Sequence, residues 1–406
     1  MHPNIDLAIR RFNLSPPPVR GEDKYEEKLT NWFLEGAFFR DFVFRNQTGK
    51  GGRGDLADGL VLFDRTALFV QSKAQDGDKD SRAWAAKNTR KALAQVGYGE
   101  RMLRERLVQE VVSDTLGPVA FDPDRYTERI GLIVLDQDDA TPFVARELVP
   151  ELAEQRFPVH VLSLPDLMEL ATRFDTASDF LFYLEERHNL SIGGVSVRVH
   201  AEIEMAGAML QLMPQRLRQH RPNVPDDVLE KTVTAFRRKV TGELRDSDDW
   251  RCSAMVDDVI AKMHDRDPEL SWNQAGSLGG VMKAAELLSS LTRDRRVAIG
   301  KKLVHAVSAE PLDPFWAFWW ATRSNKCCYV FLVSDMPREQ RQDHLVKILQ
   351  SGMARCMGKM QTDLGVGVAT NSRALQGRAY DVATRLKPLT EEERAFWLAA
   401  PDPFGF

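Results

Sequence analysis

The sequence predicts an α/β domain followed by a second, α+β domain, and three patterns support this prediction. Two apolar runs between Gly52 and Gln75 are separated by a short polar turn, which is typical of a β-hairpin. Two further short runs, 129–136 and 157–164, are rich in branched residues and are typical of buried strands. Beyond Val195 the pattern changes to long helical segments with one clear strand among them. At 406 residues, the chain is also long enough to form two hydrophobic cores.

The order of elements in the first domain favours a sheet flanked by helices. The prolines of SPPPVRG cannot continue a helix, so residues 1–20 are predicted to be an extension and residues 21–194 a domain. The spacing of one helical face is shown by Tyr25, Leu29, Trp32 and Phe33, and Gly36 is expected to end that helix. The elements expected after it are the hairpin, a long polar helix at 81–112, strands at 129–136 and 157–164, and a helix at 166–187.

The second domain, residues 195–406, carries no chemical signature. Its clearest strand is KCCYVFLVSD, with DLGVGVAT as another candidate, and the aromatic residues of PFWAFWWA are assigned to packing. A sensor, a dimerisation unit and a target-recognition domain all remain open for this part of the chain.

Composition excludes some classes of protein and leaves others open. The formal net charge of -4 excludes a globally basic nucleic-acid binder but allows a local basic groove. The four cysteines show no CxxC spacing, which argues against a zinc ribbon or a disulfide framework and suits a reducing cytoplasm. No apolar run reaches membrane-spanning length, and no signal-peptide pattern is found. We therefore expect a cytoplasmic protein with no membrane partner.

Polar residues stand in the hairpin at positions where buried strands normally carry none. In a strand, residues two apart share a face, so Asp58 lies with Leu60 and Leu62, while Gln71 and Lys73 lie together on the partner strand. A turn at 64–66 that pairs Phe63 with Thr66 would place Asp58 opposite Gln71, with Asp55 off that face. A carboxylate, an amide oxygen and an ammonium group would then converge. This combination suits metal-assisted phosphodiester hydrolysis, because hard divalent cations prefer oxygen ligands.

The arrangement of an acid, twelve intervening residues and QSK, after a helix that carries a glutamate, resembles the PD-(D/E)XK nuclease superfamily in its QxK variant. Restriction endonucleases of the Mrr type show similar patterns. The segment YEEKLTNWF is similar to the first helix of that superfamily, with Glu26 as its acid. Helical geometry agrees, since Glu26 lies about 20° from Phe33 on the rim of the buried face while Glu27 is expected to point to solvent.

The resemblance implies a restriction-endonuclease-like mixed sheet and a metal-dependent nuclease site. Its catalytic residues would be Glu26, Asp58, Gln71 and Lys73. Asp58, Gln71 and the Ser72 carbonyl would hold Mg²⁺ or Mn²⁺, and Glu26 would position a water molecule or a second ion. Lys73 would activate water and stabilise the charge that develops at phosphorus.

The long polar helix adds a candidate nucleic-acid contact. Gln95 and Tyr98 have the spacing of the Gln-x-x-Tyr helix of RecB-type nucleases, and they share a face with Lys87 and Lys91. With Arg90, these side chains form the predicted DNA-binding set.

Structural interpretations of the same residues remain open. The hairpin is also compatible with an ordinary sheet edge, Glu26 with a surface acid, and the basic helix face with a solvated surface. The leading hypothesis is a metal-dependent DNA endonuclease, with analogy at the level of domain architecture to bacterial defence effectors. The alternative is an inactive nuclease-fold module that binds nucleic acid or a protein. The second domain would regulate the site, recognise a target or form homo-oligomers.

Overall fold

The computed structural model divides the chain into two compact units, Met1–Ser247 and Asp248–Phe406. It describes residues 18–48, 55–77, 80–113, 117–220, 225–243, 248–265, 270–272, 278–308, 315–322, 326–357, 362–371 and 380–404. Most of the predicted extension, residues 1–20, lies outside the described residues.

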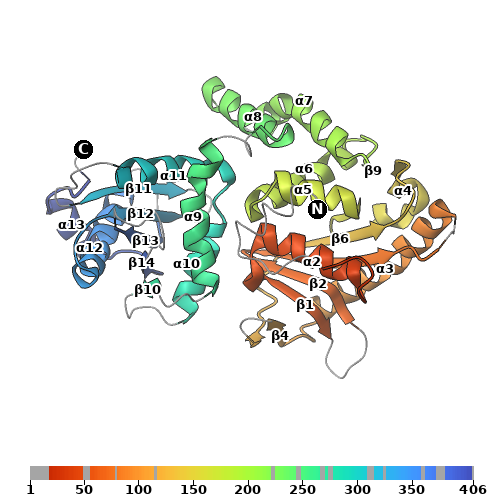
Figure 1. The fold of residues 1–406 in the computed structure, drawn as a ribbon, viewed down its shortest axis with the longest axis horizontal. Helices are drawn as coiled ribbons and strands as arrows, with labels where there is room; N and C mark the ends of the chain where they lie inside the picture. Colours follow the sequence, from red (N-terminus) through yellow and green to blue (C-terminus); the bar gives the residue numbers. More distant parts are fainter. Residues whose placement is uncertain are drawn as a thin grey trace. The chain divides into compact units, whose positions relative to one another are not determined.

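The first unit contains a mixed five-stranded sheet (Figure 1). In spatial order its strands are β1 (Val43–Thr48), β2 (Asp55–Phe63), β3 (Thr66–Ala74), β6 (Glu128–Asp136) and β8 (Val159–Ser163). Strands β1, β2 and β3 form antiparallel pairs, whereas β6 runs parallel to both β3 and β8. The apolar run predicted at 129–136 forms an interior strand that is buried on both faces, as expected for a parallel strand. The mixed α/β architecture predicted from the sequence is therefore correct.

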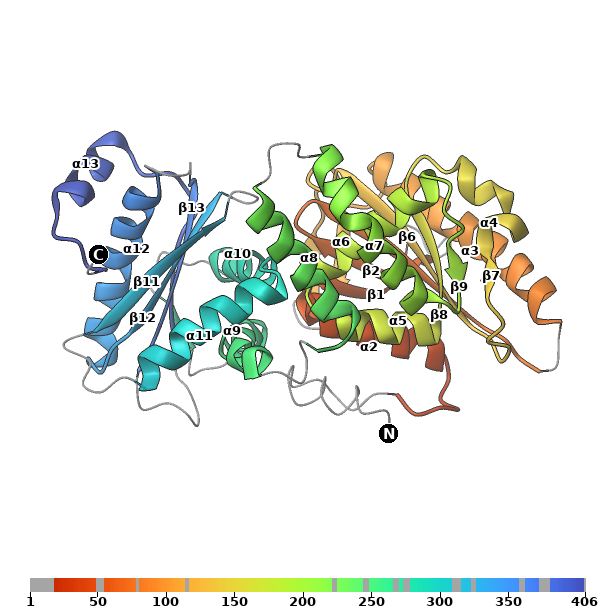
Figure 2. The ribbon, with the colours of Figure 1, turned by 90° about the horizontal axis from the view of Figure 1, so that it is seen from above.

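Helices cover both faces of this sheet (Figures 1 and 2). Helices α2 (Tyr25–Phe38), α5 (Leu164–Arg173) and α6 (Ala177–Ile192) pack on one face, where the rings of Phe38 and Phe63 meet edge to face. Helix α3 (Ser81–Arg104) covers the other face, over a hydrophobic core to which β2, β3 and β6 contribute. The smaller elements are η1 (Arg40–Phe42), β4 (Glu110–Ser113), β5 (Gly117–Ala120), β7 (Phe143–Val144), α4 (Ala145–Leu148), η2 (Pro150–Glu154) and β9 (Arg198–Val199).

Three helix boundaries differ from the predicted ones. Helix α2 continues past Gly36 to Phe38, and α3 ends at Arg104 instead of near Val112, where the chain has entered β4. The segment predicted as one helix at 166–187 forms two helices. The second of these, α6, begins anew because the Thr176 hydroxyl accepts a hydrogen bond from the backbone N–H of Asp179 at 3.2 Å.

The first unit extends beyond the boundary expected after Gly194. Helices α7 (Glu202–His220) and α8 (Asp226–Val240) follow it and belong to the same compact unit. Helix α7 packs on α5 and α6, and its residue Glu202 forms a buried ion pair with Arg187 of α6 at 2.7 Å. These contacts join α7 to the first unit, and α8 packs on α7, so the division between the units follows α8.

The second unit is built around its own five-stranded sheet, as expected for an α+β domain. Its strand order is β10 (Leu270–Trp272), β14 (Tyr380–Arg385), β13 (Leu364–Thr370), β12 (Cys327–Val333) and β11 (Trp316–Thr322). Strands β12 and β13 are the two that the sequence predicts, and most of the aromatic segment assigned to packing forms β11. The helices of this unit are α9 (Asp248–Asp265), α10 (Leu278–Ser289), α11 (Arg293–Ser308), α12 (Arg338–Met357) and α13 (Glu391–Ala399).

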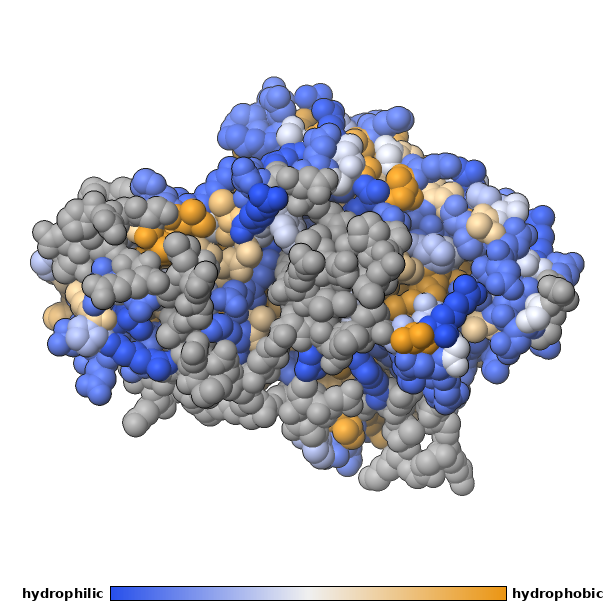
Figure 3. Space-filling view, viewed as in Figure 1, coloured by the Kyte–Doolittle hydropathy of each residue, from blue (hydrophilic) through white to orange (hydrophobic). Residues whose placement is uncertain are grey.

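The surface drawn in Figure 3 is mainly hydrophilic where it is coloured, and its hydrophobic residues form separate patches. Within the described ranges, no helix combines the length and the apolar character needed to cross a bilayer.

Candidate functional site

The hairpin of β2 and β3 has the register that the sequence predicts. Phe63 pairs with Thr66 across a two-residue turn, and the paired register continues to Gly59 and Val70. It stops there, one position short of Asp58 and Gln71. These two residues were expected to pair directly, but the main-chain pairing of the strands does not reach them. Beyond this point the Asp58 carboxylate itself accepts the backbone N–H of Ser72, with Oδ2 2.8 Å from the nitrogen. The polar cluster thus begins where main-chain pairing ends.

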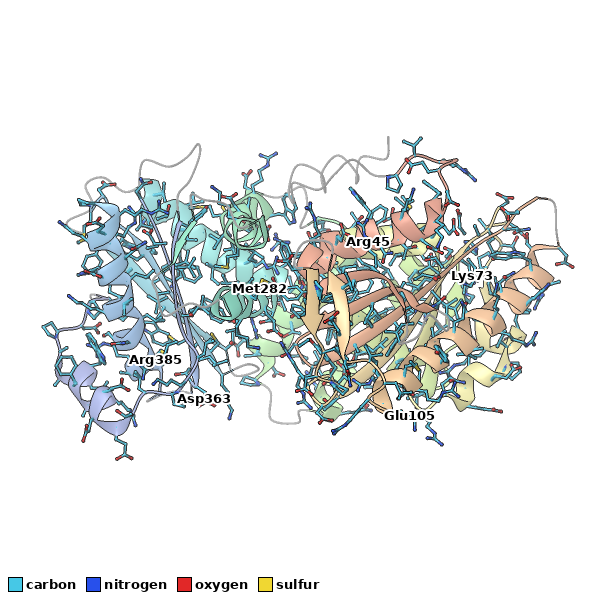
Figure 4. The ribbon with its side chains drawn as sticks, turned by 90° about the horizontal axis from the view of Figure 1, so that it is seen from below. Arg45, Lys73, Glu105, Met282, Asp363 and Arg385 are labelled. Carbon is cyan, nitrogen blue, oxygen red and sulfur yellow. The ribbon has the colours of Figure 1, made fainter. Side chains whose placement is uncertain are left out.

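The Lys73 ammonium group lies at the centre of this cluster, at the carboxyl end of β3 (Figure 4). Its Nζ is 3.3 Å from Asp58 Oδ2, 3.2 Å from Gln71 Oε1 and 2.8 Å from the backbone oxygen of Ser72. The cluster is secluded from solvent, since the Lys73 side chain is 13% exposed and Gln71 is fully buried. The structure therefore brings together four of the residues predicted for the site.

Helix α2 holds the hairpin strands from the opposite face of the sheet. Asn31 donates through Nδ2 to the backbone oxygen of Asp58 at 3.1 Å, and the hydroxyl groups of Thr30 and Ser72 lie 3.1 Å apart. Gly59 permits this approach, because a Cβ atom there would lie 2.2 Å from Asn31 Oδ1. These two polar residues of α2 were not predicted from the sequence, although Thr30 and Asn31 interrupt an otherwise apolar run, which is the available signal.

The two adjacent glutamates of α2 differ from the expectation. Glu27 does not point to solvent: its side chain is 16% exposed and pairs with the Lys24 ammonium at 3.2 Å. Burial raises the pKa of the Glu27 carboxyl, and the negative charge of Asp58 raises that pKa further. Glu27 is therefore within electrostatic reach of the cluster. Glu26 is half-buried, and within the described residues no hydrogen bond or ion pair joins it to Asp58, Gln71 or Lys73.

Helix α3 places its two predicted uncharged residues against the sheet. Tyr98 packs on the core between α3 and the sheet, and the guanidinium of Arg101 lies 5.5 Å from the centre of its ring. Gln95 is half-buried, and its Oε1 is a buried acceptor without a hydrogen-bond partner among the described residues.

The three predicted cations of α3 are all exposed, but they are not equivalent. Arg90 donates to the Leu148 carbonyl at 2.8 Å and pairs with Glu151 at 3.2 Å, so its guanidinium is engaged within the fold. No ion pair is recorded for Lys87 or Lys91 within the described part of the chain. These two lysines remain as candidate phosphate contacts.

The oxygen atoms of the cluster fit a hard divalent cation in kind and in direction. Asp58 offers a carboxylate, Gln71 an amide oxygen and Ser72 a backbone oxygen, which are ligand types that Mg²⁺ accepts. All three already converge on a positive charge, because the Lys73 ammonium group lies within hydrogen-bond distance of each. The described residues contain no group of three or more histidine, cysteine, aspartate or glutamate side chains suited to a metal, so such a site would rely on Gln71 and the Ser72 carbonyl.

Comparisons with protein-family models, with curated proteins and with solved structures give no significant match to this chain. The fold and the Lys73 cluster are therefore the basis for a functional assignment.

Proposed function

We propose that this protein is a metal-dependent nuclease that hydrolyses phosphodiester bonds in DNA. The observation that carries the proposal is the convergence of Asp58, Gln71 and the Ser72 carbonyl on the Lys73 ammonium. A lysine and oxygen ligands gathered at one point suit metal-assisted phosphodiester hydrolysis. The resemblance to the PD-(D/E)XK superfamily supports the same assignment.

Asp58, Gln71 and the Ser72 carbonyl would hold Mg²⁺ or Mn²⁺. When bound, the ion supplies Lewis-acid polarisation of a phosphodiester oxygen. Lys73, once its ammonium leaves those three oxygens, donates hydrogen bonds to the phosphate and stabilises the charge that develops at phosphorus.

Glu27 is better placed than Glu26 to orient or deprotonate the attacking water. Its pKa is raised by burial and by Asp58, and a carboxylate with a raised pKa is the better proton acceptor. Glu27 is therefore assigned as the catalytic acid residue of α2. Glu26, which the sequence favoured for this role, serves as the residue for comparison.

DNA would lie along the exposed face of α3. Lys87 and Lys91 would neutralise phosphates, while Arg90 contributes less because it is engaged by Glu151 and Leu148. Gln95 and Tyr98 lie toward the core rather than on this face, so the proposed DNA contact rests on the two lysines. The second unit would regulate the nuclease, recognise a target or mediate self-association.

One observation favours the alternative of a non-catalytic binding module. Lys73 already donates to Asp58 Oδ2 and Gln71 Oε1, so these two oxygen atoms have a hydrogen-bond partner without a bound cation. Such a cluster would serve an inactive nuclease fold equally well.

Incubation of the purified full-length chain with supercoiled plasmid separates these two candidates. If the protein is a nuclease, it should nick the plasmid in Mg²⁺ or Mn²⁺, and EDTA should abolish the nicking. DNA binding without cleavage under all three conditions would favour the binding module.

A further inference from the structure

A second polar site lies in the first unit, at the outer strand of the sheet. A cavity of about 190 Å³ opens beside β8, between α4, the end of α6 and the segment that leads into β9. Its polar lining comprises Arg146, His160, Arg187, His188, Ser191 and Ser196. Strand β6 separates β8 from the hairpin that carries Lys73. The cavity is therefore distinct from the proposed nuclease site.

The tautomer of His160 follows from its neighbour. His160 is 2% exposed, and its Nδ1 lies 3.4 Å from Nη1 of Arg187. A guanidinium group can only donate, so Nδ1 is the acceptor and the proton of the neutral ring is on Nε2. Nε2 has no hydrogen-bond partner among the described residues. His160 thus contributes a buried N–H donor whose partner is not found among the described residues.

Arg187 fixes this arrangement but is itself occupied. It donates to Glu202 at 2.7 and 3.1 Å and to the Val161 carbonyl at 2.9 Å. Its positive charge is therefore balanced by Glu202, and its role is to hold His160 in one tautomer.

Arg146 supplies the charge that the cavity leaves unbalanced. It lines the cavity from α4, and within the described ranges no ion pair is recorded for it. Burial is the largest cause that lowers the pKa of His160 and of His188; the charge of Arg146 lowers both further, and for His160 its effect is smaller than those of Arg187 and His188. Two neutral histidines beside an unpaired arginine leave this cavity with an excess of hydrogen-bond donors and of positive charge.

We propose that this cavity binds the phosphate group of a small ligand, with Arg146 as the counter-charge and the Nε2–H of His160 as a buried donor. His188 and the two serine hydroxyls line the same space. A cation does not fit, because Nε2 carries a proton and Arg146 would repel it. The volume corresponds to about six water molecules, which allows a phosphate and a small substituent. The proposal does not depend on nuclease activity.

Calorimetric titration of the full-length protein with inorganic phosphate and with methyl phosphate tests this site, with chloride as the control anion. Arg146→Gln is the test variant, because the Arg146 side chain has no recorded ion pair whose loss would unfold the protein. Arg156→Gln is the matched control, since Arg156 is an exposed arginine on the segment before β8 that does not line the cavity. Nitrogen-labelled histidine resonances report separately on His160.

The expected result is saturable binding by the wild-type chain and by Arg156→Gln, with affinity reduced about tenfold or more in Arg146→Gln. The His160 Nε2 resonance should shift on phosphate addition and keep the protonated Nε2 tautomer. The proposal is overturned by any of three results: no wild-type binding up to about 10 mM, equal affinity in Arg146→Gln, or equal losses in both variants. A His160 resonance that does not respond to bound phosphate also overturns it.

Discussion

At the scale of single residues, Gln71 has an unusual hydrogen-bonding state. Its Oε1 accepts from Lys73, while its buried Nε2 has no partner among the described residues. A carboxylate of the same shape would keep the bond to Lys73 and would replace the unsatisfied donor by an acceptor oxygen. Glutamine at this position is therefore not required by packing.

Replacing Gln71 tests its role as a ligand. Gln71→Glu should leave cleavage active and lower the Mg²⁺ concentration for half-maximal nicking, because it adds a negative charge to the site. Gln71→Ala should abolish cleavage at moderate Mg²⁺. A Mg²⁺ titration of plasmid nicking, with the distant Gln155→Ala as control, measures both effects. If Gln71→Ala titrates like the wild type, Gln71 is not a ligand.

The raised pKa of Glu27 in the folded protein leads to a prediction about stability and pH. A carboxyl with a raised folded-state pKa favours folding below its unfolded pKa, and this contribution is lost as pH rises through the folded pKa. Glu27→Gln should therefore raise the thermal stability at about pH 7 but not at about pH 4, while it slows cleavage. Glu26→Gln should change both quantities less. If thermal melts and nicking rates show larger effects for Glu26→Gln than for Glu27→Gln, Glu26 and not Glu27 is the catalytic acid residue of α2.

Some residues of the site could be predicted from the sequence and others could not. Strand alternation predicted that Asp58, Gln71 and Lys73 gather together, because the period of a strand is independent of its surroundings. The choice of Glu26 over Glu27 failed to anticipate the burial of Glu27, since helical angles do not reveal how a neighbouring strand end approaches the helix.

At the scale of elements, the predicted strands and register agree with the structure, whereas several helix ends do not. Helix α3 ends through Arg106, which adopts a left-handed φ of 56°. The N–H groups of Leu107 and Arg106 bond back to the carbonyls of Met102 and Leu103, at 2.9 and 3.0 Å. This is the Schellman arrangement, which glycine usually marks. No glycine stands here, so the sequence carried no signal for this end.

The outer face of α3 predicts how the protein responds to salt. Lys87→Ala with Lys91→Ala should weaken DNA binding and reduce the slope of log K against log salt by about one unit per lost contact. Arg90→Ala should change the slope less, because Arg90 already pairs with Glu151. Binding titrations across salt concentrations measure this, with the exposed Lys347→Ala of the second unit as control. An unchanged slope in the double variant would identify this face as a solvated surface.

At the scale of the whole molecule, the position of the boundary between the two units leads to a prediction about stability. The sequence placed the boundary after Gly194, where the strand pattern ends, but α7 carries a partner of the first unit's buried charge. Long-range pairs of this kind leave no local sequence pattern. The Arg187 and Glu202 side chains are 6% and 0% exposed, so neither can be solvated if the other is removed.

Truncation tests this boundary. A chain that ends at Ser247 should unfold cooperatively, whereas one that ends at Gly194 should lose about 3–5 kcal/mol, because Arg187 would be buried without its counter-charge. A loss of that size is a large share of the stability of a typical domain. Denaturant unfolding of both chains, with Glu202→Ala in the full chain as the point control, provides the measurement. Equal stability of the two truncated chains would restore the boundary at Gly194.

Nuclease activity at the Lys73 cluster is tested most directly by measuring the cleavage of bound DNA by the wild-type chain and by Asp58→Ala, under single-turnover conditions with Mg²⁺. Asp58 touches both Lys73 and the Ser72 backbone, so its loss should abolish cleavage while DNA binding through α3 persists. Asp343→Ala, an exposed aspartate of the second unit, should cleave like the wild type. We expect Mg²⁺-dependent cleavage that Asp58→Ala loses and Asp343→Ala keeps. Cleavage that survives in Asp58→Ala, or wild-type protein that binds DNA and never cuts it in Mg²⁺ or Mn²⁺, would contradict it.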